Sequence, residues 1–376
     1  MKTHTIAIVS FIAGALIVAA FLVTSRTSTT APQDAKAGEP VLPRLAERIN
    51  DSASIQVVRN GATSTYVRKD AGWVLAEKGD YPAKSENVRG LLIGLSQMRV
   101  VEQKTSKPEL YARIGVQDPD SSDAKATRPT DEAATQPTRV TVKDAAGASL
   151  ASIIIGTQKW GTTPEVYVRR DGEAASWLAA GRIDVPWDSL AWIDRTILTI
   201  ARDKWKSATV THPDGETITC ARADTTQSSF FLENIPPGRQ LSAPTAGDQL
   251  GFVFSGLTLD DVRPAAEVDA AHFASGIRTV GTTFDGLLVT ARSIVQDGKT
   301  WAVIEAAAEK PAEQPETAKQ ADELNKRLSP WAFMIPEYKA KGLRLRWTDV
   351  LKPAEAAPPV TEAEPTDDES EPREDE

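Results

Sequence analysis

The chain has 376 residues, more than one hydrophobic core usually serves, so we expect about two or three domains. Hydrophobic residues make up 41% and charged residues 25% of the sequence, which excludes a wholly disordered chain and a membrane protein with many spans. The formal net charge of −9 belongs to residues 354–376, which contain ten acidic residues and one basic residue. The balanced body argues against nucleic acid as the main partner, because phosphate binding needs a local basic excess.

The first predicted element is a membrane-spanning helix over residues 6–23. These 18 residues carry no charge, and a helix of that length spans about 27 Å, close to the hydrocarbon thickness of a bilayer. Lys2 precedes the stretch, which favours a cytoplasmic N-terminus and export of the rest of the chain. A cleaved signal peptide is the alternative, with Ala19 and Ala20 near its end, but its apolar region would be unusually long. We therefore expect an uncleaved anchor.

Four further segments have the composition of linkers. Residues 24–43 are rich in Thr, Ser, Ala and Pro, which is typical of a flexible tether. Residues 121–138 and 306–321 contain no Val, Ile, Leu, Met or aromatic residue. Because they have little apolar surface to bury, we expect both to be mobile excursions from folded units. Residues 354–376 predict a disordered acidic tail, the alternative being an acidic docking peptide.

The first half of the body predicts three strands followed by one amphipathic helix. Residues 55–59 and 63–68 alternate in polarity, and Asn60-Gly61 between them is a strong hairpin signal, since both central residues must accept positive φ. Residues 73–75 form the third strand. Ser85 then caps a helix. Its apolar side chains recur at helical spacing: Val88, Leu91, Leu92, Leu95 and Met98.

The second half repeats this order of elements. At an offset of 154 residues, the hairpin positions Gly61, Thr63, Thr65, Arg68 and Asp70 match Gly215, Thr217, Thr219, Arg222 and Asp224. At an offset of 157, Trp73, Val74 and Leu75 align with Phe230, Phe231 and Leu232. At an offset of 162, the helix positions Val88, Leu91, Leu92, Gly94 and Leu95 align with Leu250, Val253, Phe254, Gly256 and Leu257. The offset grows only where loops intervene, so the pattern favours an internal repeat.

Each half continues with further strands. In the first half these are residues 139–143, 151–155 and 165–169; in the second, residues 286–295 lead through the Asp297-Gly298 turn to residues 300–305. Short connections favour antiparallel pairing, so we predict an α+β fold with two duplicated units, each an antiparallel sheet with a packed amphipathic helix. The predicted domain order is an anchor (1–23), a linker (24–43), a first unit (44–203), a second unit (204–353) and the tail (354–376).

The search for chemistry assigns no catalytic, cofactor-binding or metal-ligating residue, no cofactor and no enzymatic activity. The three histidines, His4, His212 and His272, have no ligand-type spacing. No Gly-x-Ser-x-Gly elbow or Walker loop is present. Asp260-Asp261 need not face one cleft, although a glycosidase pair stays open because its spacing is spatial. Cys220 lies in an alternating segment, which predicts a buried structural thiol.

Two acidic positions have competing interpretations. Asp194-Arg195 is either a polar interaction site near Trp192 or a charge pair that fixes the end of the first unit. We favour the second interpretation, in which Arg195 reaches a carbonyl or carboxylate, because no other polar residue converges on the pair. Asp118-Pro119, after residues 111–116, predicts a helix end with a turn rather than a catalytic aspartate.

Several segments also carry a resemblance to a known family. The first are Gly72-Trp73-Val74-Leu75, Tyr81-Pro82-Ala83, the helix over residues 88–101 and residues 109–119. The later ones are residues 139–144, 165–168, Asp194-Arg195, 330–333 and 336–339. Together, over most of residues 43–353, they resemble the bacterial domain-of-unknown-function 4340 family. The resemblance implies a membrane-anchored envelope protein without established catalytic residues, in some cases encoded beside ABC-transporter permeases of the gliding-motility type.

The preferred hypothesis is a non-enzymatic accessory or scaffold protein of the cytoplasmic (inner) membrane, with both units on the extracytoplasmic, periplasmic side. Its partners would be the bilayer, through residues 6–23, and an ABC-transporter permease or another envelope protein, met through a sheet edge or an apolar patch. The alternative is an envelope glycan-binding module that uses exposed tryptophans such as Trp73 or Trp160. An envelope hydrolase is the third and weakest class.

Overall fold

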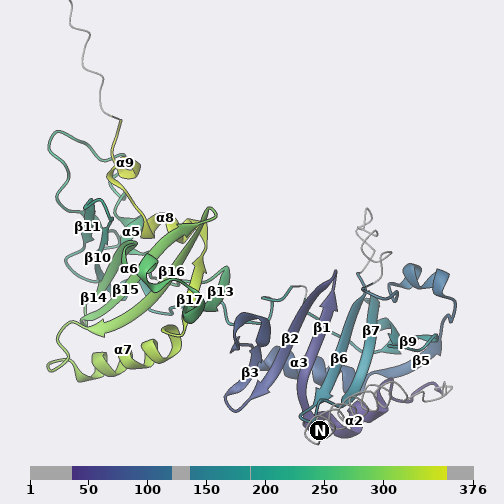
Figure 1. The fold of residues 1–376 in the computed structure, drawn as a ribbon. Coiled ribbons are helices and arrows are strands. Elements are labelled where there is room, and N and C mark those ends of the chain that lie inside the picture. Colours follow the sequence, from purple (N-terminus) through teal and green to yellow (C-terminus); the bar gives the residue numbers. More distant parts are fainter. Residues whose placement is uncertain (1–35, 121–135, 187, 354–376) are drawn as a thin grey trace, which may run out of the picture. The chain divides into compact units, whose positions relative to one another are not determined.

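The computed structural model describes residues 36–120, 136–186 and 188–353 (Figure 1). The described residues form two compact units, which divide between Asp194 and Arg195. Each unit contains one antiparallel sheet with helices, so the fold is α+β, as predicted. The predicted span over residues 6–23, residues 24–35 of the predicted linker, residues 121–135 of the predicted mobile segment and the predicted tail over residues 354–376 lie outside the described residues. The prediction of a linker that extends to residue 43 was wrong: Val41 and Leu42 are buried, and the backbone amides of Gly38 and Val41 donate hydrogen bonds to the carbonyls of Val100 and Met98 at 2.8 and 3.0 Å. Within the described ranges, no helix combines the length and apolarity needed to cross a membrane.

The division between the units falls between Asp194 and Arg195, whereas the sequence placed it after Asp203. Arg195 Nε donates a hydrogen bond to the carbonyl of Leu259 at 3.0 Å. Ile197 and Leu198 are fully buried, and their backbone amides donate to the carbonyl of Leu257 at 2.8 and 3.1 Å. The segment that begins at Arg195 therefore packs as part of the second unit.

The first sheet has nine strands, all paired antiparallel. In spatial order they are β4 (Tyr81–Pro82), β3 (Gly72–Leu75), β2 (Ala62–Lys69), β1 (Ser52–Arg59), β6 (Thr138–Asp144), β7 (Ser149–Lys159), β8 (Glu165–Arg170), β9 (Ser176–Ala180) and β5 (Arg99–Gln103). The predicted hairpin joins β1 to β2, with Asn60 at φ 54° and Gly61 at φ 73°. Strand alternation and turn chemistry thus predicted most of this sheet correctly.

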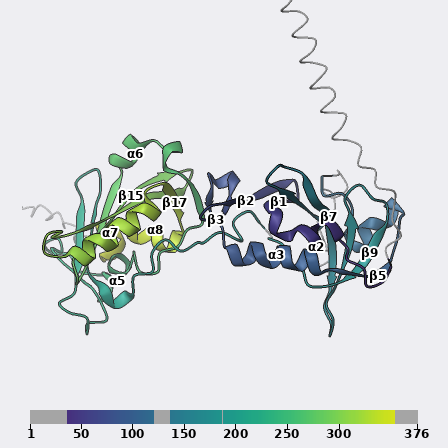
Figure 2. The same ribbon diagram turned by 90° about the horizontal axis from the view of Figure 1, so that it is seen from below.

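Two helices, α2 (Pro43–Arg48) and α3 (Ser85–Gln97), cover one face of the first sheet (Figure 2). Val88, Leu91, Leu92 and Leu95 of α3 are buried, as their spacing predicted. The helix begins at Ser85, but this side chain makes no capping bond. Its hydroxyl instead accepts a hydrogen bond from the backbone amide of Trp73 at 3.5 Å, which ties the start of α3 to β3.

Three short 3₁₀ turns complete the first unit: η1 (Ile49–Asp51), η2 (Ala76–Lys78) and η3 (Pro108–Ile114). The last ends at Gly115, with φ at 69°, which confirms the predicted helix end before Asp118. Tyr111 and Val116 beside this turn pack on Ile154 of β7 and form a small second cluster. Asp118 forms an ion pair with Arg139 of β6, which ties the residues after this turn to the sheet.

The second sheet has eight strands, also antiparallel throughout. In spatial order they are β12 (Phe231–Leu232), β11 (Thr217–Ala221), β10 (Trp205–Thr211), β14 (Ile277–Thr283), β15 (Leu287–Gln296), β16 (Lys299–Ala308), β17 (Trp331–Ile335) and β13 (Asp261–Pro264). The order matches the first sheet: β12-β11-β10-β14-β15-β16-β17-β13 corresponds to β3-β2-β1-β6-β7-β8-β9-β5. Among the described strands, β4 at the outer edge of the first sheet is the one without a counterpart.

The helices of the second unit differ most from prediction. They are η4 (Arg202–Lys204), α5 (Asp248–Gly251), η5 (Ala265–Glu267), α6 (Ala270–Ala274), α7 (Pro315–Leu328), α8 (Glu337–Leu343) and α9 (Trp347–Val350). The helix expected to match α3 is the four-residue helix α5. It ends before Phe252, whose φ of −105° is not helical. Gly251 at its end lies so close to the Phe230 ring that a Cβ would meet the ring at 2.2 Å. This close packing and the poor helix propensity of glycine accompany the early end of the helix.

The prediction of a mobile segment over residues 306–321 was wrong. Strand β16 continues through Ala306 to Ala308, and α7 begins at Pro315. Ala306, Ala308 and Ala321 are buried, because alanine packs closely even though it offers little apolar area. A prediction from hydrophobic periodicity misses such segments, because they lack the large apolar side chains on which the periodicity depends.

Candidate functional site

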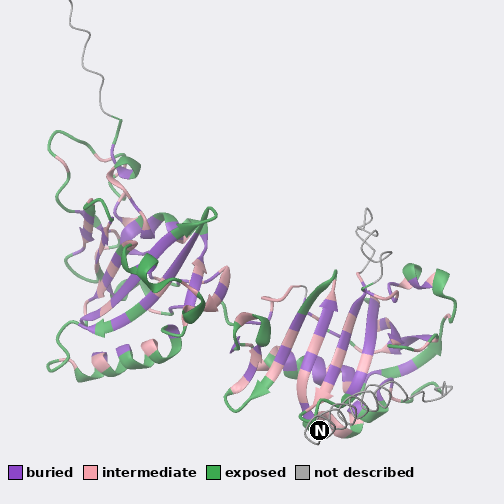
Figure 3. Ribbon diagram, viewed as in Figure 1, coloured by how far each residue is buried: buried purple, intermediate pink, exposed green. Residues whose placement is uncertain are grey.

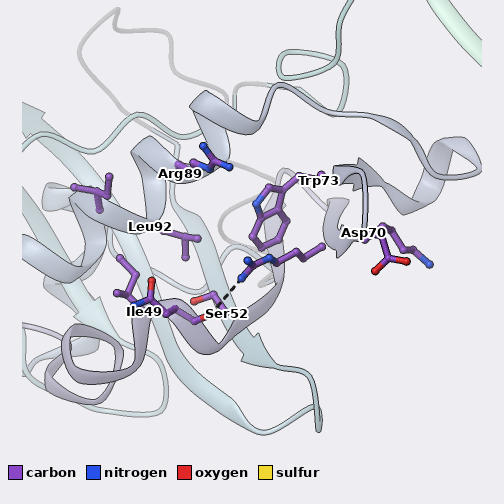
Figure 4. A pocket seen from close by; sticks show the side chains of 11 residues that line it. Ile49, Ser52, Asp70, Trp73, Arg89 and Leu92 are labelled. Carbon is purple, nitrogen blue, oxygen red and sulfur yellow. Dashed lines mark hydrogen bonds between the residues drawn. The ribbon is translucent and has the colours of Figure 1, made fainter. Parts of the chain in front are cut away.

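A cavity of about 360 Å³ opens in the first unit, between η1, the start of β1, the β2–β3 hairpin and α3. Figure 4 shows the side chains of Ser52, Trp73 and Arg89 around one space, with Asp70 at one end. The walls come from segments about 40 residues apart in the sequence, which the sheet and its covering helix bring together. Its volume falls within the range of small-molecule sites, about 300–1,000 Å³.

The cavity has an excess of basic side chains. Arg68, Lys69 and Arg89 line it, against one carboxylate, that of Asp70. Lys69 Nζ lies 3.5 Å from a carboxylate oxygen of Asp80, an exposed ion pair. Arg68 donates one hydrogen bond, from Nη1 to the carbonyl of Asn50 at 3.2 Å. The exposed Arg89 side chain has neither a hydrogen bond nor an ion pair with any described residue, so its charge is available to a ligand.

The remaining wall combines apolar surface with one buried hydroxyl. Trp73 and Leu92 are each 6% exposed, and the neighbouring Ile93 is 48% exposed. Ser52 is 2% exposed, and its Oγ has no hydrogen-bond partner within the part of the chain that the structure describes. Leaving a buried hydroxyl unpaired costs roughly 1–3 kcal/mol. The site therefore offers a hydrogen bond, two guanidinium groups and an apolar wall, without a histidine, cysteine or carboxylate pair in its lining.

A second cavity, of about 590 Å³, lies in the second unit. Its charged residues largely satisfy one another: Arg344 pairs with Glu337, and Arg346 Nη1 lies 2.8 Å from a carboxylate oxygen of Asp214. His212 is 4% exposed, and its Nε2 lies 3.0 Å from the carbonyl of Leu345. These contacts hold the C-terminal segment on the sheet, so they are structural rather than open to a ligand.

Asp194 and Arg195, which the sequence singled out, do not line the first cavity. Arg195 reaches the carbonyl of Leu259 and, through Nη2, a carboxylate oxygen of Asp260 at 2.9 Å. This confirms the structural interpretation, but the arginine fixes the start of the second unit rather than the end of the first. Asp194 lies on the other side of the division, where its carbonyl accepts a hydrogen bond from Tyr81 Oη at 3.1 Å.

Cys220 and His272, which the sequence analysis also considered, both lie in the second unit. Cys220 is fully buried in β11, and desolvation raises the pKa of its thiol to about 12, which confirms the prediction of a structural cysteine. His272 lies on α6, and the described residues contain no group of three or more His, Cys, Asp or Glu side chains able to hold a metal ion.

The tryptophans proposed for sugar stacking differ from each other. Trp160 is 67% exposed, and the Arg182 guanidinium lies 5.6 Å from the centre of its ring. Trp73 is 6% exposed and belongs to the cavity wall. The sequence missed Ser52, Arg68 and Arg89 as site residues, because none belongs to a catalytic motif. The available signal was the internal repeat, in which Arg68 aligns with an arginine whose surroundings are different.

Comparison with known proteins identifies one family. The family model described as "Domain of unknown function (DUF4340)" matches residues 73–275, more than half of the chain. The match includes α3 and Trp73 on one side of the cavity, the strands of the first sheet from β4 to β9, and strands β10 to β13 of the second sheet, whereas β1, β2 and β14 to β17 lie outside it. No curated protein matches the chain, and no solved structure matches it either.

Proposed function

Because the chain belongs to the DUF4340 family, whose description assigns no activity, we propose that it is a non-enzymatic accessory or scaffold protein anchored in the cytoplasmic membrane. The anchor would be residues 6–23, which are long and apolar enough in sequence to span a bilayer. Residues 24–35 would tether the two units on the extracytoplasmic side, whereas Val41 and Leu42 are buried in the first unit. An ABC-transporter permease is the partner class that the family resemblance suggests.

One observation carries the proposed role in partner binding. In the first sheet, β4 covers the outer edge of β3, with Val74 paired to Pro82. In the second sheet the equivalent strand β12 is itself the edge. Phe231 of this strand aligns with Val74 and is 57% exposed. An uncovered edge strand with an exposed aromatic side chain is a surface on which a partner can add a strand or bury an apolar group.

We also infer that the two units descend from one duplicated unit. The equivalent strand orders support this inference, and so does a shared irregularity. Pairing of β1 with β6 shifts between Ser52 and Ser54, and pairing of β10 with β14 shifts between Trp205 and Ser207. Such bulges are specific features of a fold, so their recurrence at equivalent positions favours common descent over chance.

Affinity purification of the full chain from native membranes in a mild detergent tests the proposed role. We expect a permease subunit of an ABC transporter to co-purify in near-stoichiometric amount. Phe231→Ser should reduce its recovery at least fivefold, because the exposed ring no longer contributes apolar contact. Val295→Ser is the matched control, since Val295 is another exposed apolar residue of the second unit, 49% exposed, on β15 rather than β12.

Deleting residues 1–23 provides a further control. The shortened chain should leave the membrane fraction and lose the permease, because the anchor holds both proteins in one bilayer. A full chain that purifies alone, or a Phe231→Ser variant that recovers as much permease as the Val295→Ser variant, contradicts the docking role of β12.

Glycan binding is the second candidate function, favoured by Trp160. An exposed indole ring beside an arginine is a surface that can stack on a sugar. It is a single ring, whereas a stacking platform usually combines rings, and for this reason we place glycan binding second.

A further inference from the structure

The two units place different side chains at the position of Ser52. The shared bulge aligns Ser52 with Trp205, since each residue begins the first strand of its sheet. Trp205 is fully buried and packs on the Phe254 ring, with 5.5 Å between ring centres. In the first unit the same position holds a small hydroxyl that has no partner among the described residues. A bulky ring in one unit thus corresponds to a small buried hydroxyl in the other, and the Trp205 Nε1 likewise has no hydrogen-bond partner among the described residues.

The aligned arginines Arg68 and Arg222 also differ in their surroundings. The hairpin registers place both opposite the bulged start of the neighbouring strand. Arg222 is 5% exposed. Its guanidinium donates hydrogen bonds to four backbone carbonyls, those of Trp205, Gln227, Arg202 and Asp203. Arg68 is exposed and donates to the single carbonyl of Asn50, so its other donors have no partner in the described part of the chain.

A third difference concerns an aromatic ring that contacts an arginine in the second unit. In the second unit the Arg202 guanidinium lies over the Phe252 ring, 3.6 Å from its centre. The turns η1 and η4 precede the aligned strands, which places Ile49 at the position of Arg202. Gly90 aligns with Phe252 at the offset of 162 residues. A Cβ at Gly90 would meet no atom within 4 Å beyond its own turn of the helix, so the aligned position is exposed and carries no ring.

These differences leave hydrogen-bond donors around the first cavity without matching acceptors. Arg68, Arg89 and the Ser52 hydroxyl can all donate into a space of about 360 Å³. Guanidinium groups recognise carboxylate and phosphate oxygens well, because their donors form a planar fork. Trp73 and Leu92 present apolar surface on the same cavity. A ligand that satisfies the site must therefore combine an anionic group with an apolar part.

We propose that this cavity binds a small soluble anion, a carboxylate or phosphate monoester attached to an apolar group. Arg68 and Arg89 contact the anionic oxygens, Ser52 Oγ donates one hydrogen bond to them, and Trp73 and Leu92 contact the apolar part. The second unit has lost or never held this site, because its equivalent arginine is bound by backbone carbonyls. The proposal is independent of the β12 docking edge, which lies in the other unit.

Calorimetric titration of the full chain with phenyl phosphate tests the proposal. We expect saturable binding with one site per chain. Inorganic phosphate should bind at least tenfold more weakly because it lacks the apolar part, and phenol should bind at least tenfold more weakly because it lacks the charge. Arg89→Gln and Ser52→Ala should each weaken phenyl phosphate binding about tenfold. Arg89 is an exposed residue without a partner among the described residues, so its substitution should leave folding intact.

Lys319→Gln is the matched control, because it removes the same charge from an exposed helix, α7, in the second unit. It should leave the dissociation constant unchanged. The absence of saturable binding, or an Arg89→Gln variant that binds as tightly as the Lys319→Gln variant, overturns the proposal. Binding to anionic lipid vesicles without binding to phenyl phosphate also overturns it, since the site would then serve a membrane surface rather than a soluble ligand.

Discussion

Arg68 and Arg222 occupy the same position of a repeated hairpin, yet only Arg222 contributes strongly to the stability of its unit. The Arg222 guanidinium is buried and donates hydrogen bonds to backbone carbonyls at the start of β10, among them those of Trp205 and Asp203. Three aromatic rings, those of Phe230, Phe252 and Phe284, lie within 6 Å of it. Charge, hydrogen bonds and ring contacts therefore coincide on one side chain.

Replacing Arg222 with methionine should lower the free energy of unfolding of the second unit by about 3 kcal/mol. The substitution leaves several buried carbonyls without donors, and each such loss is costly. Arg68→Met is the matched variant and should lower the stability of the first unit by less than about 1 kcal/mol, because this side chain is exposed. Hydrogen exchange with mass spectrometry resolves the two units. Equal effects in both would contradict the assignment of Arg222 as a structural arginine.

The sequence predicted the alignment of these arginines but not their different environments. Identity at one position says nothing of the neighbouring segments that fill or leave the space around it. Ser52 and Trp205 occupy equivalent positions, but this equivalence follows only from the strand pairing and its bulge. The sequence alone therefore did not show that a hydroxyl in one unit takes the place of an indole ring in the other. Cys220 was easier to interpret, because a single cysteine in an alternating strand has few roles besides packing.

At the scale of elements, helix α7 supplies hydrogen bonds to a part of strand β16 that has no neighbouring strand on one side among the described residues. Strand β16 pairs with β15 along its whole length, but with β17 only over Thr300, Trp301 and Ala302. Beyond these residues the side chain of Asn325 on α7 takes over. Its Oδ1 accepts from the backbone amide of Ala306, and its Nδ2 donates to the carbonyl of the same residue, both at 2.8 Å. One amide side chain thus replaces a strand at an otherwise open edge.

Asn325→Ala should therefore lower the free energy of unfolding by about 1–2 kcal/mol, the size expected for two lost hydrogen bonds at a partly buried site. The backbone amide of Ala306 should exchange with solvent at least tenfold faster, which hydrogen exchange measures directly. Lys326→Ala, at the next and exposed position of α7, should change neither quantity appreciably. Unchanged exchange at Ala306 in the Asn325 variant would show that the edge is protected by other contacts.

Elements with local signals were predicted well, whereas those that depend on distant contacts were not. The Asn60-Gly61 and Asp297-Gly298 turns require positive φ, and both residues of each turn have it. Helix α3 shows its buried stripe in the spacing of its leucines. In contrast, α7 packs against β16 partly through Ala321 and the buried Thr317. Such small residues give no hydrophobic pattern from which a packed helix could be inferred.

At the scale of the whole molecule, the two units share one topology and differ in what they leave open. The first unit covers its β3 edge with β4 and keeps a cavity lined by basic residues. The second fills the equivalent positions with aromatic rings and leaves β12 as an edge. If both proposals hold, ligand binding and partner docking belong to different copies of the same fold. A ligand-site variant should then leave docking unchanged, and a docking variant should leave ligand binding unchanged.

The division between the units can be tested with two fragments that differ only in where they begin. Residues 195–353 should fold cooperatively, because they contain Arg195 and the fully buried Ile197 and Leu198. Residues 204–353, which begin at the boundary predicted from sequence, should be less stable by about 4 kcal/mol or fail to fold. Burial of two large aliphatic side chains alone accounts for roughly this amount. Arg327 adds to it, since its Nη2 donates to the carbonyl of Ile197 at 2.7 Å. Urea unfolding monitored by circular dichroism measures the difference, and equal midpoints and slopes for the two fragments would place residues 195–203 outside the folded second unit.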